Sequence, residues 1–77
     1  MDILEKDLET LLEQLCSELG FCLPKLVKQR LIKYSPKKPK KFANTIVIAE
    51  GLDPLTMDSE LYSIVLNRVK TVYRKYT

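Results

Sequence analysis

Apolar residues recur every three or four positions in two long stretches of this chain, a spacing that places them on one face of a helix. In the first stretch, residues 3–19, the apolar stripe consists of leucines: Leu4, Leu8, Leu11, Leu12, Leu15 and Leu19. In the second stretch, residues 58–76, it is a wider and more varied arc: Leu61, Tyr62, Val65, Val69, Val72, Tyr73 and Tyr76. The pattern predicts a long amphipathic helix near each end of the chain.

Both glycines fall where a helix is expected to end. Gly20 closes the leucine-rich stretch and is followed by Phe21, and Gly51 closes a second apolar segment and is followed by Leu52. Glycine readily adopts the left-handed conformation that a helix terminus needs, and an apolar residue after it can fold back on the last turn. The glycines therefore predict helix ends near residues 19 and 50.

A shorter helix is predicted over residues 24–34. Pro24 suits the first helical position, where its fixed φ is helical and its missing N–H costs nothing. The inward face is expected to carry Val27, Leu31 and Tyr34. The other side is expected to carry the polar residues of the segment: Lys25, Lys28, Gln29 and Lys33.

Residues 42–50 have two readings. Thr-Ile-Val-Ile-Ala at 45–49 favours a strand by propensity. The spacing of the apolar residues and the stop at Gly51 favour a short buried helix, and no partner strand is available to satisfy a strand's backbone groups. We therefore predict a helix, with residues 46–48 as its most buried part.

Residues 35–41, Ser-Pro-Lys-Lys-Pro-Lys-Lys, predict a flexible basic loop, because prolines oppose a helix and the lysines repel one another. The chain as a whole is thus expected to be one all-α domain over residues 1–77. Its fold is expected to be a small bundle of four helices at about 3–19, 24–34, 42–50 and 58–76, with the Lys/Pro-rich loop at its centre.

Charge is strongly sorted along the chain, although the net charge is only +3. Six acids and the single base Lys6 occupy the first nineteen residues. Eight Lys and Arg residues follow between Lys25 and Lys41, and no acid appears between Glu18 and Glu50. This distribution predicts a cationic surface flanked by anionic ones.

The two cysteines, Cys16 and Cys22, are too few to define a disulfide scaffold. We expect free thiols that pack as small apolar groups in the core. The alternative is a bridge across the end of the first helix in an exported protein. The chain opens with an acidic segment and not with a secretion signal, so a cytoplasmic location is predicted.

Catalysis is the least favoured function. The chain has no histidine, which is the commonest general base and the commonest zinc ligand. The acids around the second glycine do not have the spacing of a calcium loop; they are Glu50, Asp53, Asp58 and Glu60. We therefore expect no enzymatic activity, no cofactor and no metal.

These features predict a small non-enzymatic helical binding or adaptor module that contacts an acidic macromolecule, with a protein favoured over a nucleic acid. The predicted contacts are electrostatic and come from Lys25, Lys28, Lys33, Lys37, Lys38, Lys40 and Lys41. The alternative is a nucleic-acid-binding regulator resembling a helix-turn-helix protein, since a tight glycine-containing turn leads into a basic helix. No contact with a membrane is expected. Self-association is a further hypothesis, because the apolar arcs are wide for so short a chain.

Overall fold

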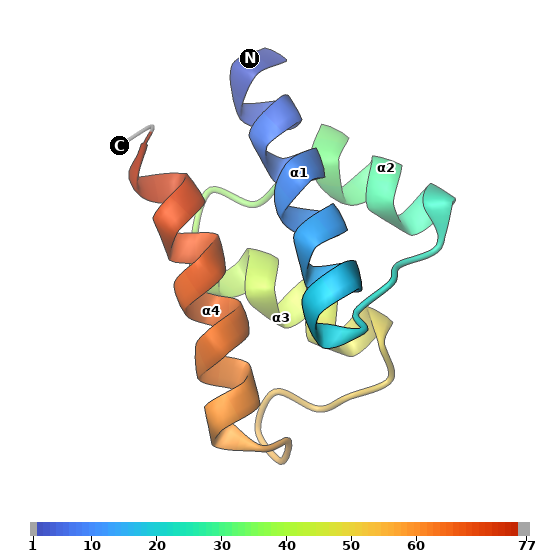
Figure 1. Cartoon of the computed structure of the whole chain (residues 1–77), viewed down its shortest axis with the longest axis vertical. Coiled ribbons are helices and arrows are strands. Elements are labelled where there is room, and N and C mark those ends of the chain that lie inside the picture. The colour runs from blue at the N-terminus through green and yellow to red at the C-terminus, as the bar shows by residue number, and fades with distance from the viewer. Residues whose placement is uncertain (1, 76–77) are drawn as a thin grey trace.

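The computed structural model describes residues 2–75, and the side chains of residues 5–75. This part of the chain contains four helices and no strand. They are α1 (Asp2–Leu19), α2 (Lys25–Lys33), α3 (Pro39–Ala49) and α4 (Ser59–Arg74), shown in Figure 1. The predicted all-α fold is confirmed. The positions predicted for the Leu4 and Tyr76 side chains lie outside the described residues.

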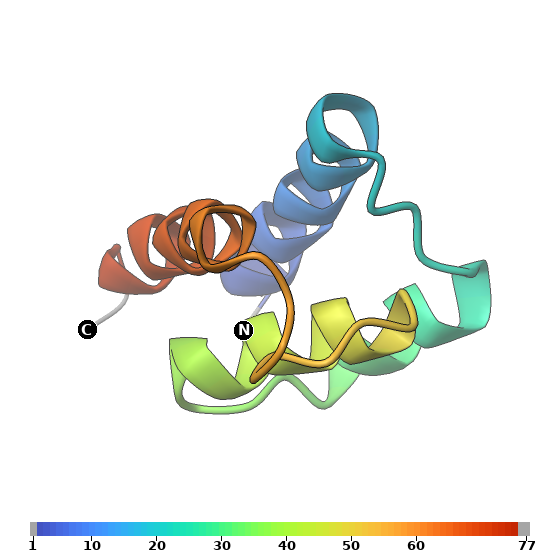
Figure 2. The same ribbon diagram turned by 90° about the horizontal axis from the view of Figure 1, so that it is seen from below.

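The helices form two layers, with α1 and α4 in one and α2 and α3 in the other (Figure 2). The most extensive contact is between α3 and α4, while α2 packs against α1 and, over a smaller area, against α3. The folded chain measures 33 × 26 × 20 Å. Among the described helices α2 makes no contact with α4, so it occupies an edge of the bundle and keeps one side uncovered.

All four helices contribute to a single core. Its buried residues include the leucine stripe of α1 and one face each of α3 and α4. They are Leu8, Leu11, Leu12, Leu15, Phe21, Leu31, Phe42, Ala43, Ile46, Val47, Val65, Val69 and Tyr73. Phe42 and Tyr73 meet edge to face, with their ring centroids 5.8 Å apart. The stripes read from the sequence of α1 and α4 are therefore the faces that the fold buries.

Both glycines end a helix as predicted. Gly20 and Gly51 have φ values of 78° and 81°, in the left-handed region that glycine adopts without strain. The N–H of Gly20 donates to the Cys16 carbonyl at 3.0 Å. At the end of α3 the N–H of Leu52 reaches back to the Val47 carbonyl at 2.9 Å, a Schellman-type closure. The apolar residue after each glycine, Phe21 or Leu52, packs on the core.

The ambiguous segment is a helix, which rejects the strand reading, but two details of the prediction are wrong. Helix α3 begins at Pro39, so residues 39–41 belong to it and not to the loop. Pro39 takes the first helical position, where proline is tolerated. Ile48 is 60% exposed, because it points away from the face that buries Ile46 and Val47. Residues 46–48 are thus not buried as a unit.

The face assigned to α2 is also partly wrong. Leu31 is buried as predicted and Val27 is half-buried, but Tyr34 is 70% exposed. Instead, Ile32 packs against the core and Lys28 is half-buried. The reason is tertiary: α2 lies at the bundle edge against α1 and α3, and this position turns its inward face toward Ile32.

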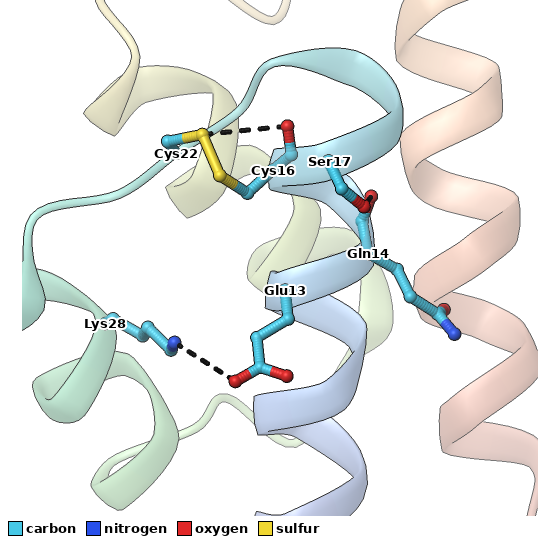
Figure 3. The surroundings of a disulfide bond; sticks show 6 residues. All are labelled: Glu13, Gln14, Cys16, Ser17, Cys22 and Lys28. Atoms are coloured by element: carbon cyan, nitrogen blue, oxygen red, sulfur yellow. Dashed lines mark hydrogen bonds and ion pairs between the residues drawn. A yellow bond between two sulfur atoms is a disulfide. The ribbon is translucent and has the colours of Figure 1, made fainter.

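Cys16 and Cys22 form a disulfide, so the prediction of free thiols is wrong (Figure 3). Their Cα atoms are 4.3 Å apart, because the left-handed turn at Gly20 folds the chain back over the last turn of α1. Cys16 is only half-buried and Cys22 is exposed. The core cluster includes neither cysteine, so both sulfurs lie near the surface, where they can bond to each other.

Candidate functional site

The uncovered side of α2 carries an apolar and basic stripe. Leu26 and Arg30 of α2 and Tyr34, the residue directly after the helix, follow one another at intervals of four residues, so they extend along one side of α2 over about 12 Å. Leu26 is 80% exposed and Tyr34 70%. Exposed large apolar side chains that gather in one place are a mark of interaction surfaces.

A hollow of about 480 Å³ lies along this stripe. Its wall is formed by α2, by the segment that follows it and by one residue of α3: Leu26, Val27, Arg30, Leu31, Tyr34, Pro36 and Thr45. A shallower hollow adjoins it and shares Leu26, Arg30 and Tyr34, with Gln29 and Lys33 as its other members. We call these two hollows together the α2 groove. Its floor is apolar, and its charged members are all cations.

The cations of the α2 groove have no counter-charge of their own. Neither Arg30 nor Lys33 forms an ion pair with any described residue. The Lys33 ammonium lies 5.6 Å from the centroid of the Tyr34 ring, within the range of a cation–π contact. The ring therefore keeps a positive charge beside the apolar floor.

The seven lysines predicted as contacts do not surround one hollow. Lys33 lies in the α2 groove, Lys37 lines a hollow beside α4, and Lys28 lines one beside the disulfide. The others are exposed on the surface: Lys25, Lys38, Lys40 and Lys41. The cationic surface is therefore spread over several parts of the molecule.

Lys28 is the one predicted contact that forms an ion pair with a described residue. Its ammonium lies 3.9 Å from a Glu13 carboxylate oxygen of α1 (Figure 3). The Lys28 side chain is about one third exposed and Glu13 is more open. This pair and the disulfide hold the start of α2 to the end of α1. Lys28 therefore helps to position α2 and is less free for a partner.

A second ion pair ties α1 to α4. The Arg68 guanidinium donates a hydrogen bond to a Glu18 carboxylate oxygen. Through this bond it lowers the pKa of the Glu18 carboxyl from its ordinary value, and the pKa of Arg68 is raised by the same contact. Two of the α1 carboxylates are thus matched internally, by Lys28 and Arg68.

Sequence reasoning missed the apolar half of the groove. Tyr34 was assigned to the core, and neither Leu26 nor Arg30 was singled out. One signal was present: residues 26, 30 and 34 have helical spacing, and two of them are apolar. On a short helix that already has an inward face, such a second stripe has to lie on the surface.

Comparison of the chain with protein-family models, curated proteins and solved structures gives no match. Of the described helices, none combines the length and the apolar character needed to cross a bilayer.

Proposed function

We propose that this protein is a non-enzymatic binding module whose α2 groove receives an acidic amphipathic segment of another protein. The observation that supports this is the union of exposed Leu26 and Tyr34 with unmatched Arg30 and Lys33. A helix that places leucine-like side chains on the floor and carboxylates against the rim would satisfy both features. This is the helix-in-groove mode of recognition.

The size of the groove limits the partner. A stripe of about 12 Å matches two to three turns of a helix. Apolar anchors on one side of these turns would supply most of the affinity, because buried anchors dominate binding energies. Acidic residues beside them would raise the association rate and select against basic segments.

The groove favours a protein over a nucleic acid. A helix that reads DNA presents polar donors to base edges. The uncovered side of α2 instead presents Leu26 and Tyr34, which offer apolar surface. If the protein instead bound a nucleic acid, its affinity would depend on the lysines and not on Leu26 or Tyr34.

The disulfide bears on where such a module works. Disulfides persist in oxidising environments and are rare in the reducing cytosol. The Cys16–Cys22 bridge therefore supports a location that meets oxidising conditions, and it weighs against the cytoplasmic location predicted from the sequence.

A designed peptide tests the proposal. The probe is a fluorescent 14-residue helix with leucines on one face and glutamates on the other, and its control is a scrambled peptide of equal composition. We expect saturable binding of the amphipathic peptide alone. Replacing Leu26 and Tyr34 by alanine should weaken it about tenfold or more, since these are the floor residues. Ile48→Ala, which removes an exposed apolar side chain outside the groove, should leave it unchanged.

The same variants separate the two functions. A generic DNA duplex is titrated in parallel at several salt concentrations. Two results together would support nucleic-acid binding and reject the proposal. The affinity for the duplex would fall log-linearly with salt concentration, and it would be equal in the wild type and the Leu26/Tyr34 double variant. Equal binding of the amphipathic and scrambled peptides would also reject it.

A further inference from the structure

The hollow beside α4, of about 350 Å³, lies between the Lys/Pro segment and the end of that helix. Its wall is formed by Lys37, Pro39, Lys70, Tyr73 and Arg74. Three of these five residues are cations, and none of the five is an acid. We call this hollow the cationic hollow.

The three cations come from two separate parts of the chain. Lys70 and Arg74 are four residues apart on α4, so they lie on the same side of that helix. Lys37 comes from the segment between α2 and α3. Charge near the end of α4 is explained in part by its macrodipole, which favours cations there. The macrodipole of α4 does not explain why Lys37 is brought to the same place.

The position of the Lys37 segment is set by a buried tyrosine. The Tyr73 hydroxyl donates a hydrogen bond of 2.5 Å to the Pro36 carbonyl, next to Lys37 in the chain. The Tyr73 ring is held in the core against Phe42. Lys37 is thus presented to the hollow from a tethered segment and not from a freely moving one.

No counter-charge accompanies these cations. None of the three forms an ion pair with a described residue. Helix α3 begins at Pro39, which is part of the wall of the hollow, and its first turn contains no acidic residue and no side-chain cap. Its N–H groups and helix dipole therefore add to the positive potential on that side. All three cations line one hollow, so an anion bound there would lie near each of them.

We infer that the cationic hollow binds a phosphate dianion, either as free phosphate or as the phosphoryl group of a modified side chain. A phosphate group offers several acceptor oxygens and a charge close to −2 at neutral pH, which suits two ammonium groups and one guanidinium. The assignment does not depend on the α2 groove. The two sites adjoin, because Pro36 lines the groove and Lys37 the cationic hollow.

The test is an NMR titration of the whole chain with inorganic phosphate, against sodium chloride at equal ionic strength. We expect saturable shifts of the amides near residues 37–41 and 70–74. Replacing Lys70 and Arg74 together by alanine should weaken phosphate binding roughly five- to tenfold. The variant Lys37→Ala, which changes no helix, should weaken it about two- to fivefold.

The matched control is the double variant Lys6→Ala, Lys25→Ala. It removes the same charge as the α4 pair from two residues outside the cationic hollow. We expect it to bind phosphate almost as the wild type does. Equal loss in the control and the α4 double variant would overturn the site, because the effect would then be one of net charge. Shifts that do not saturate, or that chloride reproduces, would overturn it as well.

Parallel titrations with O-phosphoserine and with serine distinguish the source of the phosphate. Tighter binding of phosphoserine than of inorganic phosphate would support a modified side chain, and equal binding would support the free anion. Serine should not bind. Because the second pKa of a phosphate ester is about 6, binding should weaken as the pH is lowered from 7.5 to 5. Binding that stays constant over this range would contradict recognition of the dianion.

Discussion

At the scale of single residues, the Glu50 side chain has a buried polar atom without a hydrogen-bond partner. This atom is Oε1, and no described residue donates to it. Glu50 also follows directly after α3, where the carbonyl end of the helix dipole disfavours a negative charge. The carboxylate is therefore doubly unfavourable in this place.

We expect Glu50→Gln to stabilise the chain by about 0.5–1 kcal/mol, because it removes the charge and supplies a donor for the free carbonyls at the end of α3. Chemical denaturation measures the change in the free energy of unfolding. Glu9→Gln, an exposed position within α1, should change it very little. A Glu50 variant that is no more stable than the Glu9 variant would show that the carboxylate is already satisfied.

Tyr73 is predicted to make stability fall at alkaline pH. Burial raises the pKa of its hydroxyl above the ordinary value of 10.0. Well below pH 10 the hydroxyl is neutral in both the folded and the unfolded chain, so the free energy of unfolding does not depend on its titration. Above it, the unfolded chain loses the proton first, and stability falls as the pH rises toward the folded pKa.

The variant Tyr73→Phe isolates this effect. It keeps the ring in the core and loses the bond to Pro36, so it should be less stable by about 1 kcal/mol at pH 7. The difference in the free energy of unfolding between the variant and the wild type should shrink between pH 9 and 11. Over this range Tyr73 ionises more readily in the unfolded wild type than in the folded one, which lowers the wild-type stability, whereas phenylalanine does not titrate. Stability curves that remain parallel over this range would contradict the raised pKa.

At the scale of the elements, α3 provides an internal comparison. Ile46 is fully buried between the layers, and Ile48, two residues later, is 60% exposed. We expect Ile46→Ala to destabilise the fold by about 2–4 kcal/mol through lost burial and a residual cavity. Ile48→Ala should change it by less than about 0.5 kcal/mol. Thermal denaturation of the two variants checks the pair, and equal losses would mean that α3 is rotated from the position described.

The junction of α1 and α2 depends on the disulfide. The cysteines are separated by six positions. Closing so short a loop lowers the entropy of the unfolded chain, which stabilises the folded state by about 2 kcal/mol. Replacing both cysteines by serine should lower the free energy of unfolding by about that amount, and reduction of the wild type should do the same. A reducing agent should not affect the double variant. If reduction leaves the wild-type stability unchanged, the bridge is not formed in solution.

For the molecule as a whole, the acidic start of the chain is only partly matched by its own cations. Glu18 and Arg68 are fifty positions apart and join α1 to α4. Because Arg68 lowers the pKa of Glu18 below 4.5, the pair stabilises the fold at pH values above 4.5. This contribution is lost as the pH falls through the lowered pKa.

Glu18→Gln should therefore be slightly less stable than the wild type at pH 7, and the two should converge as the pH falls below the lowered pKa of Glu18. The difference should shrink in high salt, since the pair is exposed and screened. Chemical denaturation at pH 3, 5 and 7 measures it. A difference that is independent of pH would assign the loss to packing and not to charge.

Self-association remains a prediction at this scale. The wide apolar arcs of α1 and α4 that suggested it are largely covered by the core. Exposed apolar surface is found instead at scattered positions, of which Leu26 and Tyr34 line the same hollow. If the chain self-associates, we therefore expect the contact to involve the α2 groove and not the arcs of α1 and α4.

The sequence by itself determined the number of helices in the described part of the chain, the two helix ends at the glycines and the core faces of the two long helices. Local chemistry carries this information: leucines at helical spacing define the face of α1, and Gly20 and Gly51 each stop a helix where they stand. Pro39 belongs to the same class, because its place at the start of α3 follows from proline chemistry, although the loop was predicted to extend beyond it.

Only the tertiary structure decided the rest. Which side of α2 faces inward depends on how α1 and α3 lie around it. For this reason Tyr34, predicted to face the core, lies at the surface. The bond between Cys16 and Cys22, and the presence of Lys37, Lys70 and Arg74 in the wall of one hollow, likewise depend on distances in space that spacing along the chain does not fix. Periodicity tells which residues share a face, and packing alone tells which faces are covered.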